Sequence, residues 1–371
     1  MKIGKEDRIL RQRLRENDPT LQRLEISHWM GLSDDEDSTQ DFLETLSGNT
    51  SVESLSISAK AVQTFSSDTI LRILDTASTE CVNLRSVEIS TPVINRVDKA
   101  IAGNVVVSLL QKCRNLETLV LWPFVLLDSM KVIDDLALVL RDNQRLRTLS
   151  LLNVMLEKGR QRQNTNNGNS EIAAANKSEP PVLLLDPVVQ ALACLPSLTN
   201  IHLSPCFRVQ KDRCLIAVPK CVTRDLLQSS LTSASRSTLQ SLSLRNMGLD
   251  DTFGVPLAMA LRNSRVVLQH LDLRFNTFGK PTSAAFCETL ENFNTTVTSL
   301  SLDTTCTSDE DYSHQINLLV RLNAAGRGVL VRQGGPLTAC WDGFYASCDD
   351  TDVMFHLLRV SPQLFVKRQN S

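Results

Sequence analysis

Histidines and a glycine-rich segment are the parts of this sequence most able to support catalysis or metal binding. The five histidines are scattered, at positions 28, 202, 270, 314 and 356. His202 and His270 fall in predicted strands that are two apart, roughly 10 Å, which is too far for both to bind one metal ion directly. The glycine-rich segment 326–335 lacks the lysine pattern of a phosphate-binding loop, and the sequence contains no zinc-protease, serine-hydrolase or EF-hand motif. Cys340 or Cys348 could form a nucleophile and base with His356, but all three lie in a predicted capping segment. We therefore expect a protein that is not an enzyme, with no catalytic residue, no metal site and no cofactor.

The ten cysteines are interpreted as free thiols. None forms a CxxC pair, and none lies at zinc-finger spacing from a histidine. The charged N-terminal segment lacks the apolar stretch of a secretory signal, so we expect a reducing cytoplasmic location, with the nucleus as an alternative. Cys81, Cys113 and Cys194 each precede a leucine-patterned segment by three or four residues. A position that recurs in this way is typical of a small buried core residue rather than a reactive thiol.

Exposed apolar side chains are the first candidates for binding a protein partner. Val120, Trp122 and Leu152 fall on the expected exposed face of two neighbouring predicted strands. Tryptophan on such a face is unusual, and tryptophan is enriched at the energetic centres of protein interfaces. Two interpretations stay open: these residues anchor a partner, or Trp122 is covered by a long insertion.

A charged cluster further along the chain is the second candidate. Its members are Arg245, His270, Asp272, Arg274 and Asp303. Adjacent strands bring such residues within pairing distance. The cluster is therefore either a set of surface ion pairs or a site that recognises an acidic or polar peptide. His202, on a preceding strand, is a further candidate contact.

A recurring leucine pattern explains how these residues are positioned. The motif L-x-x-L-x-L, with Ile or Val allowed, begins at residues 21, 52, 84, 116, 146, 198, 239, 268 and 297. All but two of the intervals are 29–32 residues long. Alternating apolar residues at motif positions 4 and 6 predict a short strand with one buried face. Apolar residues at helical spacing between the motifs, such as Ile133, Leu136 and Leu140, predict a helix in the interval.

This pattern resembles the ribonuclease-inhibitor-like class of leucine-rich repeat proteins over roughly residues 8–322. The best match is LQHLDLRFNTFG (268–279), with leucine at motif positions 1, 4 and 6 and Asn276 at position 9. The resemblance implies an α/β solenoid of about nine repeats, curved like a horseshoe, with a parallel concave sheet and convex helices. Motif positions 3, 5 and 7 then point to the concave face. Other residue types hold position 9 elsewhere, so the asparagine ladder usual in that turn is nearly absent.

The pattern also predicts how the chain is divided. Residues 1–20 are expected to form an N-terminal capping helix, residues 21–322 the solenoid, and residues 323–371 a C-terminal cap. The Asn- and Ser-rich segment 161–181 is expected to be a disordered insertion in the solenoid.

The C-terminal segment carries its own helix signals. Asp349, Asp350, Thr351 and Asp352 are all suitable N-cap residues, and Phe355, Leu358 and Val360 would form an apolar helical face. The segment is similar to the cap of poorly characterised leucine-rich repeat proteins common in diatoms. The matching residues are Asn323, Ala325, Gly326, Arg327, Trp341, Phe355, Leu358 and Pro362.

Composition narrows the class of partner. The 371 residues carry a formal net charge of −2, without the basic excess of most nucleic-acid-binding proteins. No apolar run approaches the roughly 20 residues of a membrane-spanning helix. We expect neither nucleic acid nor membrane as a partner, and predict a non-enzymatic scaffold that binds a protein or peptide on its concave face, by analogy of fold. The alternative is a regulator of a small GTPase resembling the Ran GTPase-activating proteins, which also use long repeats.

Overall fold

The structure is a computed structural model of the 371-residue chain. It describes residues 5–27, 36–90, 101–122, 125–127, 129–156, 186–193, 195–205, 238–263, 266–303, 310–328 and 349–360. The predicted insertion 161–181 lies outside these residues. The chain divides into two compact units: unit 1 is Met1–Ser197 with Leu203–Pro219, and unit 2 is Leu198–His202 with Lys220–Ser371. No helix within the described ranges combines the length and apolar character needed to span a membrane.

Unit 1 is an α/β unit whose parallel sheet is made from five of the leucine-patterned segments. Its strands pair in the order β1 (Arg23–Ile26), β2 (Ser54–Ile57), β3 (Ser86–Ile89), β5 (Thr118–Leu121) and β7 (Thr148–Leu156). The register sets motif position 4 of each strand beside that of the next, as Leu24 beside Leu55. One face of the sheet is therefore a continuous row of buried apolar side chains. The predicted positions of these strands are confirmed.

The residue at motif position 2 fixes the register between strands. Its carbonyl oxygen accepts two hydrogen bonds from the next strand, as Glu53 O does from Arg85 N (2.7 Å) and Ser86 N (3.0 Å). The side chains at this position alternate in charge, in the order Glu53, Arg85, Glu117 and Arg147. The Arg85 and Glu53 side chains approach to 3.8 Å, and those of Arg147 and Glu117 to 3.7 Å, measured from nitrogen to oxygen. These pairs are largely exposed, so each contributes little to stability.

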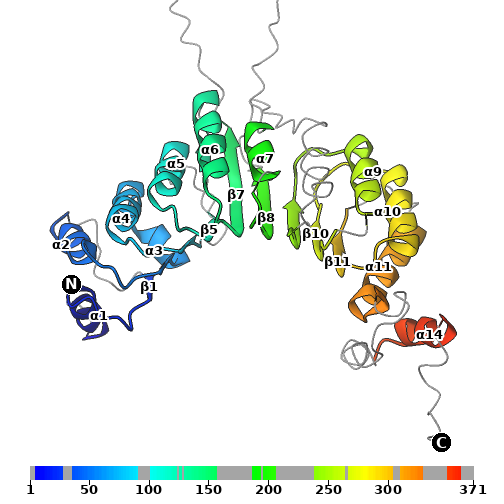
Figure 1. The fold of residues 1–371 in the computed structure, drawn as a ribbon, viewed down its shortest axis with the longest axis horizontal. Helices are drawn as coiled ribbons and strands as arrows, with labels where there is room; N and C mark the ends of the chain where they lie inside the picture. Colours follow the sequence, from blue (N-terminus) through cyan, green and yellow to red (C-terminus); the bar gives the residue numbers. More distant parts are fainter. Residues whose placement is uncertain are drawn as a thin grey trace, which may run out of the picture. The chain divides into compact units, whose positions relative to one another are not determined.

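Helices separate the strands of unit 1, and all of them except α3 pack side by side in sequence order (Figure 1). They are α1 (Lys5–Arg15), α2 (Glu36–Leu46), α3 (Ala59–Thr64), α4 (Ser67–Glu80), α5 (Gly103–Lys112), α6 (Met130–Asp142) and α7 (Asp186–Ala193). Ser58, Ser66 and Ser129 accept hydrogen bonds from first-turn amides of α3, α4 and α6, and so define where these helices begin. The predicted apolar face of α6, which includes Ile133 and Leu136, is buried.

Unit 1 also contains a shorter set of parallel strands that the leucine pattern does not predict. β4 (Ile101–Ala102) pairs with β6 (Val125–Leu127), and β6 pairs with the second half of β7, Val154–Leu156. Val125 and Leu127 are buried. The chain therefore continues as paired strand beyond motif position 6, where the six-position motif gives no information.

Unit 2 is an α/β unit with the same alternation of strand and helix. Leu198–His202 contributes the start of β8 (Asn200–Pro205). The parallel strands β9 (Ser241–Leu244), β10 (His270–Asp272) and β11 (Ser299–Ser301) follow, and motif position 4 is again in line, with Leu271 between Leu242 and Leu300. The helices are α9 (Asp251–Ala260), α10 (Lys280–Asn292), α11 (Glu310–Ala324) and α14 (Thr351–Val360).

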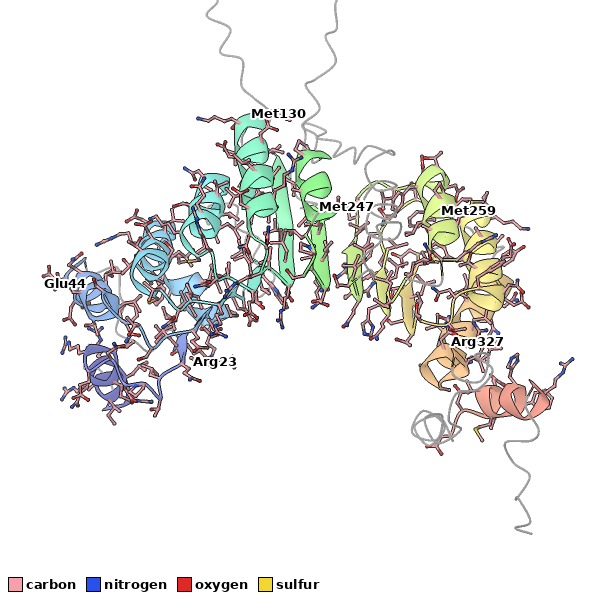
Figure 2. All side chains as sticks on the ribbon, viewed as in Figure 1. Arg23, Glu44, Met130, Met247, Met259 and Arg327 are labelled. Atoms are coloured by element: carbon pink, nitrogen blue, oxygen red, sulfur yellow. The ribbon has the colours of Figure 1, made fainter. Side chains whose placement is uncertain are left out.

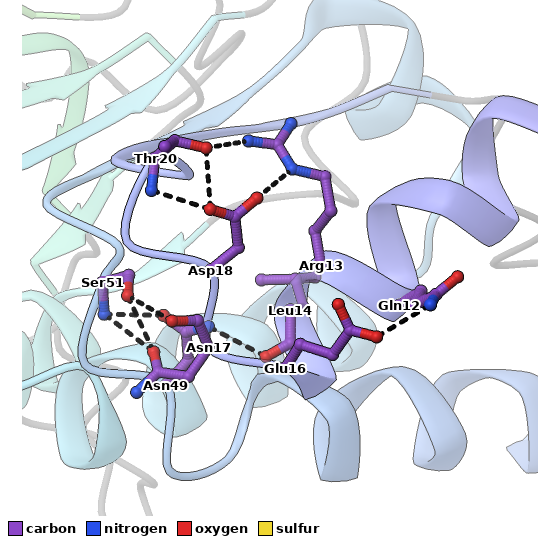
Figure 3. A network of polar contacts seen from close by, with 9 residues as sticks. All are labelled: Gln12, Arg13, Leu14, Glu16, Asn17, Asp18, Thr20, Asn49 and Ser51. Carbon is purple, nitrogen blue, oxygen red and sulfur yellow. Dashed lines mark hydrogen bonds and ion pairs between the residues drawn. The ribbon is translucent and has the colours of Figure 1, made fainter.

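Asparagine side chains hold several of the turns before strands, three residues ahead of motif position 1. Figure 3 shows this arrangement at Asn49, whose Oδ1 accepts from Ser51 N (3.0 Å) and whose Nδ2 donates to Leu14 O in α1 (3.1 Å). Asn294 donates in the same way to Leu261 O (2.9 Å) in unit 2. Each of these side chains therefore joins one strand–helix segment to the one before it. Sequence reasoning looked for such a ladder at position 9 and missed this one.

Cysteine takes the same place in two other turns. Cys113 Sγ donates to Ser78 O at 3.7 Å, and both Cys81 and Cys113 are buried. The prediction that these two are small buried core residues is confirmed, and Cys194 lies outside the described residues. Burial raises the pKa of Cys113 to about 11, although the charge of Lys112 opposes the shift.

Asn276, at motif position 9, joins the turns that follow β9 and β10. It is buried. Its Oδ1 accepts from Met247 N (2.9 Å) and Leu249 N (3.1 Å), while its Nδ2 donates to Leu244 O (2.8 Å) and Leu273 O (2.7 Å). One side chain therefore satisfies four backbone groups that the turns would otherwise leave unpaired.

The N-x-A-G-R turn noted in the sequence closes the end of α11. Asn323 Nδ2 donates to Val297 O (2.9 Å), and the buried Arg327 guanidinium donates to Leu290 O. Between them, Gly326 has a left-handed backbone with φ +88°, which glycine adopts without strain. These residues tie the end of α11 to the segment that contains α10.

The predicted C-terminal helix is present as α14, but its apolar face differs from the prediction. Asp350 Oδ1 accepts from Val353 N (3.2 Å) and caps the helix. Phe355, expected on the apolar face, is 68% exposed, whereas Val353 is fully buried. Phe355 is two residues after the buried Val353, so the two side chains lie on different sides of the helix. Arg321 of α11 pairs with Asp350 at 2.7 Å, at the start of α14, and the side chains of Leu358 and Val360 lie outside the described residues.

Candidate functional site

Trp122 is a large apolar residue that is exposed on the strand face of unit 1, the face formed by motif positions 3, 5 and 7. It follows β5 directly, and its backbone N donates to Ile89 O (3.0 Å). Its side chain is 43% exposed, so the residues that the structure describes leave much of it uncovered. Val120 is half-buried on the same strand. Leu152 is one residue beyond the last register pair of β5 and β7, and its side chain lies outside the described residues.

The rest of the unit 1 strand face carries mainly small polar side chains. Arg23 and Glu25 on β1 are exposed, and Arg23 is labelled in Figure 2. Ser150 was expected to be exposed but is buried. Its short side chain lies beside the larger Val120, its register partner on β5.

Unit 1 also has a cavity of about 670 Å³ on its helical layer, lined by α2, α4 and α5. Most of its charged groups already pair within the protein. Arg72 donates to Gln40 (2.8 Å), Gln40 donates to Glu44 (2.9 Å), and Lys112 donates to Asp75 (2.5 Å). This cavity therefore presents fewer unmet polar groups than the strand face of unit 2.

The charged cluster predicted in unit 2 is centred on Asp272. Its carboxylate accepts hydrogen bonds from Arg274 Nε (2.9 Å) and Nη2 (2.8 Å), and Arg245 Nε lies 3.7 Å away. Burial by itself raises the pKa of Asp272, but the Arg274 hydrogen bonds and the two guanidinium charges outweigh burial and lower it below its usual value. Arg274 is therefore paired within the cluster.

Arg245 is held in a different way. Its guanidinium carbon lies 5.1 Å from the centroid of the Phe275 ring, a cation–π contact. Its Nε is buried and has no hydrogen-bond acceptor among the described residues. Phe275 is 51% exposed and has a left-handed backbone, with φ +62°, and its N–H donates to Asp303 Oδ2 at 2.6 Å. Sequence reasoning missed Phe275, because the residue type gives no sign of a left-handed backbone.

His202 and His270 lie at different positions of the unit 2 strand face. The backbone N–H groups of Gln240 and Ser241 donate to Thr199 O, and this register places His202 of β8 beside Ser243 of β9. Ser243 in turn pairs with Asp272 of β10. Burial lowers the pKa of His202 and Asp272 only partly opposes this shift, so His202 is neutral at pH 7. Ser243 was expected to be exposed but is buried between these longer side chains. His270 is exposed, and no cluster of metal-binding side chains occurs in the described part of the chain.

A smaller cavity of about 260 Å³ opens beside Arg274. Its other lining residues come from β11, the residues next to it, and α11: Leu300, Ser301, Leu302, Ser313, Ile316 and Asn317. A cavity that is lined by both apolar and polar side chains and has a cation beside it can accept one side chain of a peptide. The strand face of unit 2 thus combines a paired arginine, an arginine with unmet donors and an exposed aromatic ring.

No protein-family model matches the chain, and no curated protein matches it.

Proposed function

We propose that this protein is a leucine-rich repeat solenoid, similar to the ribonuclease-inhibitor-like class, that acts as a non-enzymatic scaffold for a protein or peptide partner. The fold assignment is supported by the leucine motifs that coincide with parallel strands and by the helices that alternate with them. The shared register of motif positions supports it further. Solenoids of this kind offer an extended face for binding.

The observation that carries the functional proposal is the exposure of Trp122. A tryptophan side chain that is 43% exposed, on a face built mainly of serine, threonine and charged residues, is costly to leave in contact with water. Buried tryptophan is among the most frequent anchors of protein interfaces. Val120, half-buried on the same strand, would extend the contact. The partner would cover both side chains.

Affinity purification with mass spectrometry, comparing the wild type with Trp122→Asp, tests this proposal. We expect a protein that is captured by the wild type and lost with the variant, because a buried unpaired carboxylate would oppose the interface. Both proteins must first show the same circular dichroism spectrum and melting temperature.

Leu138→Asp is the matched control. Leu138 is 57% exposed on α6, so the variant places the same charge on the helical layer of the same unit. Capture should survive this change. Partners that persist with Trp122→Asp, or that are lost equally with Leu138→Asp, would contradict the proposal.

Regulation of a small GTPase is the alternative function, and the arginines of the unit 2 strand face are the residues it would use. Arg274 is committed to Asp272 by two hydrogen bonds, whereas Arg245 retains unmet donors. Stimulation of GTP hydrolysis by purified small GTPases, lost with Arg245→Ala, would support this alternative. No stimulation would eliminate it.

A further inference from the structure

Arg245 is a cation on the unit 2 strand face whose hydrogen-bonding capacity is unused. A guanidinium carries five N–H donors, and Arg245 Nε is buried without an acceptor among the described residues. The nearest carboxylate, that of Asp272, is 3.7 Å from this nitrogen and already accepts two hydrogen bonds from the Arg274 guanidinium. Nε is too deeply buried to meet a ligand, but the Arg245 side chain as a whole is 36% exposed, so its terminal N–H groups are the donors that an incoming acceptor can reach.

The surroundings hold the Arg245 guanidinium in place before any ligand arrives. The Phe275 ring supports it at 5.1 Å, and Asp303 fixes the Phe275 backbone by accepting its N–H at 2.6 Å. Phe275 also has a left-handed backbone, φ +62°, a conformation that costs free energy in a bulky residue and is concentrated at functional sites. A guanidinium that is already oriented loses little side-chain entropy on binding.

The geometry points to a binding site for an acidic peptide, in which Arg245 donates to a glutamate or aspartate side chain of the partner. Guanidinium and carboxylate match each other with two parallel hydrogen bonds. The exposed Phe275 ring would contact the aliphatic part of the same side chain. This inference rests on the proposed function, because it names the kind of partner that the strand face of unit 2 accepts.

The neighbouring charges favour a carboxylate over a phosphate. Asp272 and Asp303 are both next to the arginines, and His202 is neutral at pH 7 because burial lowers its pKa. A phosphate group carries close to two negative charges at this pH, and the two arginines, balanced by the two aspartates, offer no excess of positive charge to hold the second one. The attraction therefore comes from unmet donors rather than from an excess of positive charge.

A phage-displayed library of random heptapeptides, selected in parallel on the full-length wild type and on Arg245→Gln, tests this inference. We expect the wild type to enrich peptides that contain Glu or Asp, and the variant to lose this enrichment. Arg23→Gln is the matched control, since Arg23 is an exposed arginine on the strand face of unit 1, and it should enrich the same peptides as the wild type.

The enriched sequence is then synthesised with a fluorescein label, together with a copy in which its acidic residue is replaced by the amide. Fluorescence anisotropy should give a dissociation constant at least tenfold higher for the amide peptide, and likewise for Arg245→Gln with the acidic peptide. Phe275→Asn is a second variant, since asparagine tolerates the left-handed backbone. It removes the ring while keeping Arg245, and should weaken binding several-fold.

Three results would overturn the inference: enrichment without acidic residues, equal enrichment by wild type and Arg245→Gln, or no enrichment by either. These failures are separate from failure of the proposed function. If Trp122→Asp abolishes partner capture while Arg245→Gln changes nothing, the scaffold function stands and the acidic-peptide site is rejected. If acidic peptides depend on Arg245 while Trp122→Asp changes nothing, the anchor is wrong and the peptide site stands.

Discussion

The carboxylate of Asp251, in α9, lies 2.6 Å from the hydroxyl of Thr282, in α10, and accepts its hydrogen bond. The same oxygen accepts from Gly279 N (2.8 Å). Gly279 is the N-cap of α10 and has no side chain to cap the helix. One helix therefore supplies the N-terminal cap and the negative charge that its neighbour lacks.

Removal of this cap should destabilise unit 2. We expect Asp251→Ala to lower the free energy of unfolding by about 1 kcal/mol, the usual effect of losing an N-cap side chain. Urea denaturation followed by circular dichroism measures the change. Thr282→Val should add little in the Asp251→Ala background, because the two residues share one interaction; fully additive effects would contradict the shared contact.

The left-handed backbone of Phe275 gives a prediction about substitution. Asparagine tolerates this conformation, whereas a β-branched residue does not. We expect Phe275→Val to be less stable than Phe275→Asn by about 1 kcal/mol, although valine is the closer replacement in polarity. The melting temperatures of the two variants distinguish backbone strain from loss of apolar contact. A higher melting temperature for Phe275→Val than for Phe275→Asn would show that the φ of +62° does not constrain the residue type.

Asn276 should be one of the most sensitive positions in unit 2. Asn276→Ala would leave Met247 N, Leu249 N and two carbonyl oxygens without their hydrogen-bond partner. Buried backbone groups without partners are costly, so we expect a loss of roughly 2–4 kcal/mol in the free energy of unfolding. Asn292→Ala, an exposed asparagine at the end of α10, is the control and should change stability by less than about 0.5 kcal/mol. Equal effects would refute the role of Asn276.

Asp18 makes stability depend on pH in the acid range. Hydrogen bonds from Arg13 and then Thr20 hold the pKa of Asp18 at about 2, below its usual 3.8, and Figure 3 shows these contacts. Because the folded-state pKa is the lower one, the stabilisation is fully present above about pH 4 and is lost as the pH falls through about 2. The difference in unfolding free energy between wild type and Asp18→Asn should therefore narrow between pH 4 and pH 2. A difference that is constant over this range would exclude the ionised Asp18 as its cause.

Cys113 and Cys287 should resist alkylation in the native protein. Burial raises the pKa of each thiol to about 11, and only the thiolate reacts at an appreciable rate. We expect iodoacetamide at pH 8 to leave both unmodified in the folded chain and to modify both in 6 M guanidinium chloride. Peptide mapping by mass spectrometry distinguishes them from the other cysteines. Rapid native modification of Cys113 would show that its turn opens.

The positions of strands and helices could be predicted from the sequence because apolar spacing reports directly on burial. Leu24 and Ile26 follow the two-residue period of a strand, and Ile133 and Leu136 follow the period of a helix. Both predictions hold in the structure. The shorter strands β4 and β6 were not predicted, because they form only through pairing with segments that are distant in the sequence. A run as short as Val125–Leu127 carries no period of its own.

The candidate site was predictable only in its composition. Motif positions 3, 5 and 7 indicated which residues share a face. They did not indicate which small side chains on that face are buried by larger neighbours. Ser243 is buried for that reason. The contact between Arg245 and Phe275 depends on the left-handed backbone of Phe275. Phenylalanine rarely adopts this conformation, so the residue type did not predict it. Asn49 and Asn294 were overlooked because the same place in other turns of this chain is filled by cysteine. Cysteine does not resemble asparagine in its side-chain chemistry, so the recurring position was not recognised as a hydrogen-bonding one.

The alternating charges at motif position 2 also bear on how similar strands avoid mispairing while the chain folds. If β3 were skipped and β2 paired with β5, Glu53 would lie beside Glu117. If β5 were skipped, Arg85 would lie beside Arg147. Like charges placed opposite each other oppose pairing, whereas the native order brings the Arg85 and Glu53 side chains to 3.8 Å. A row of charges that adds little to the finished sheet thereby penalises the intermediates in which one strand is left out.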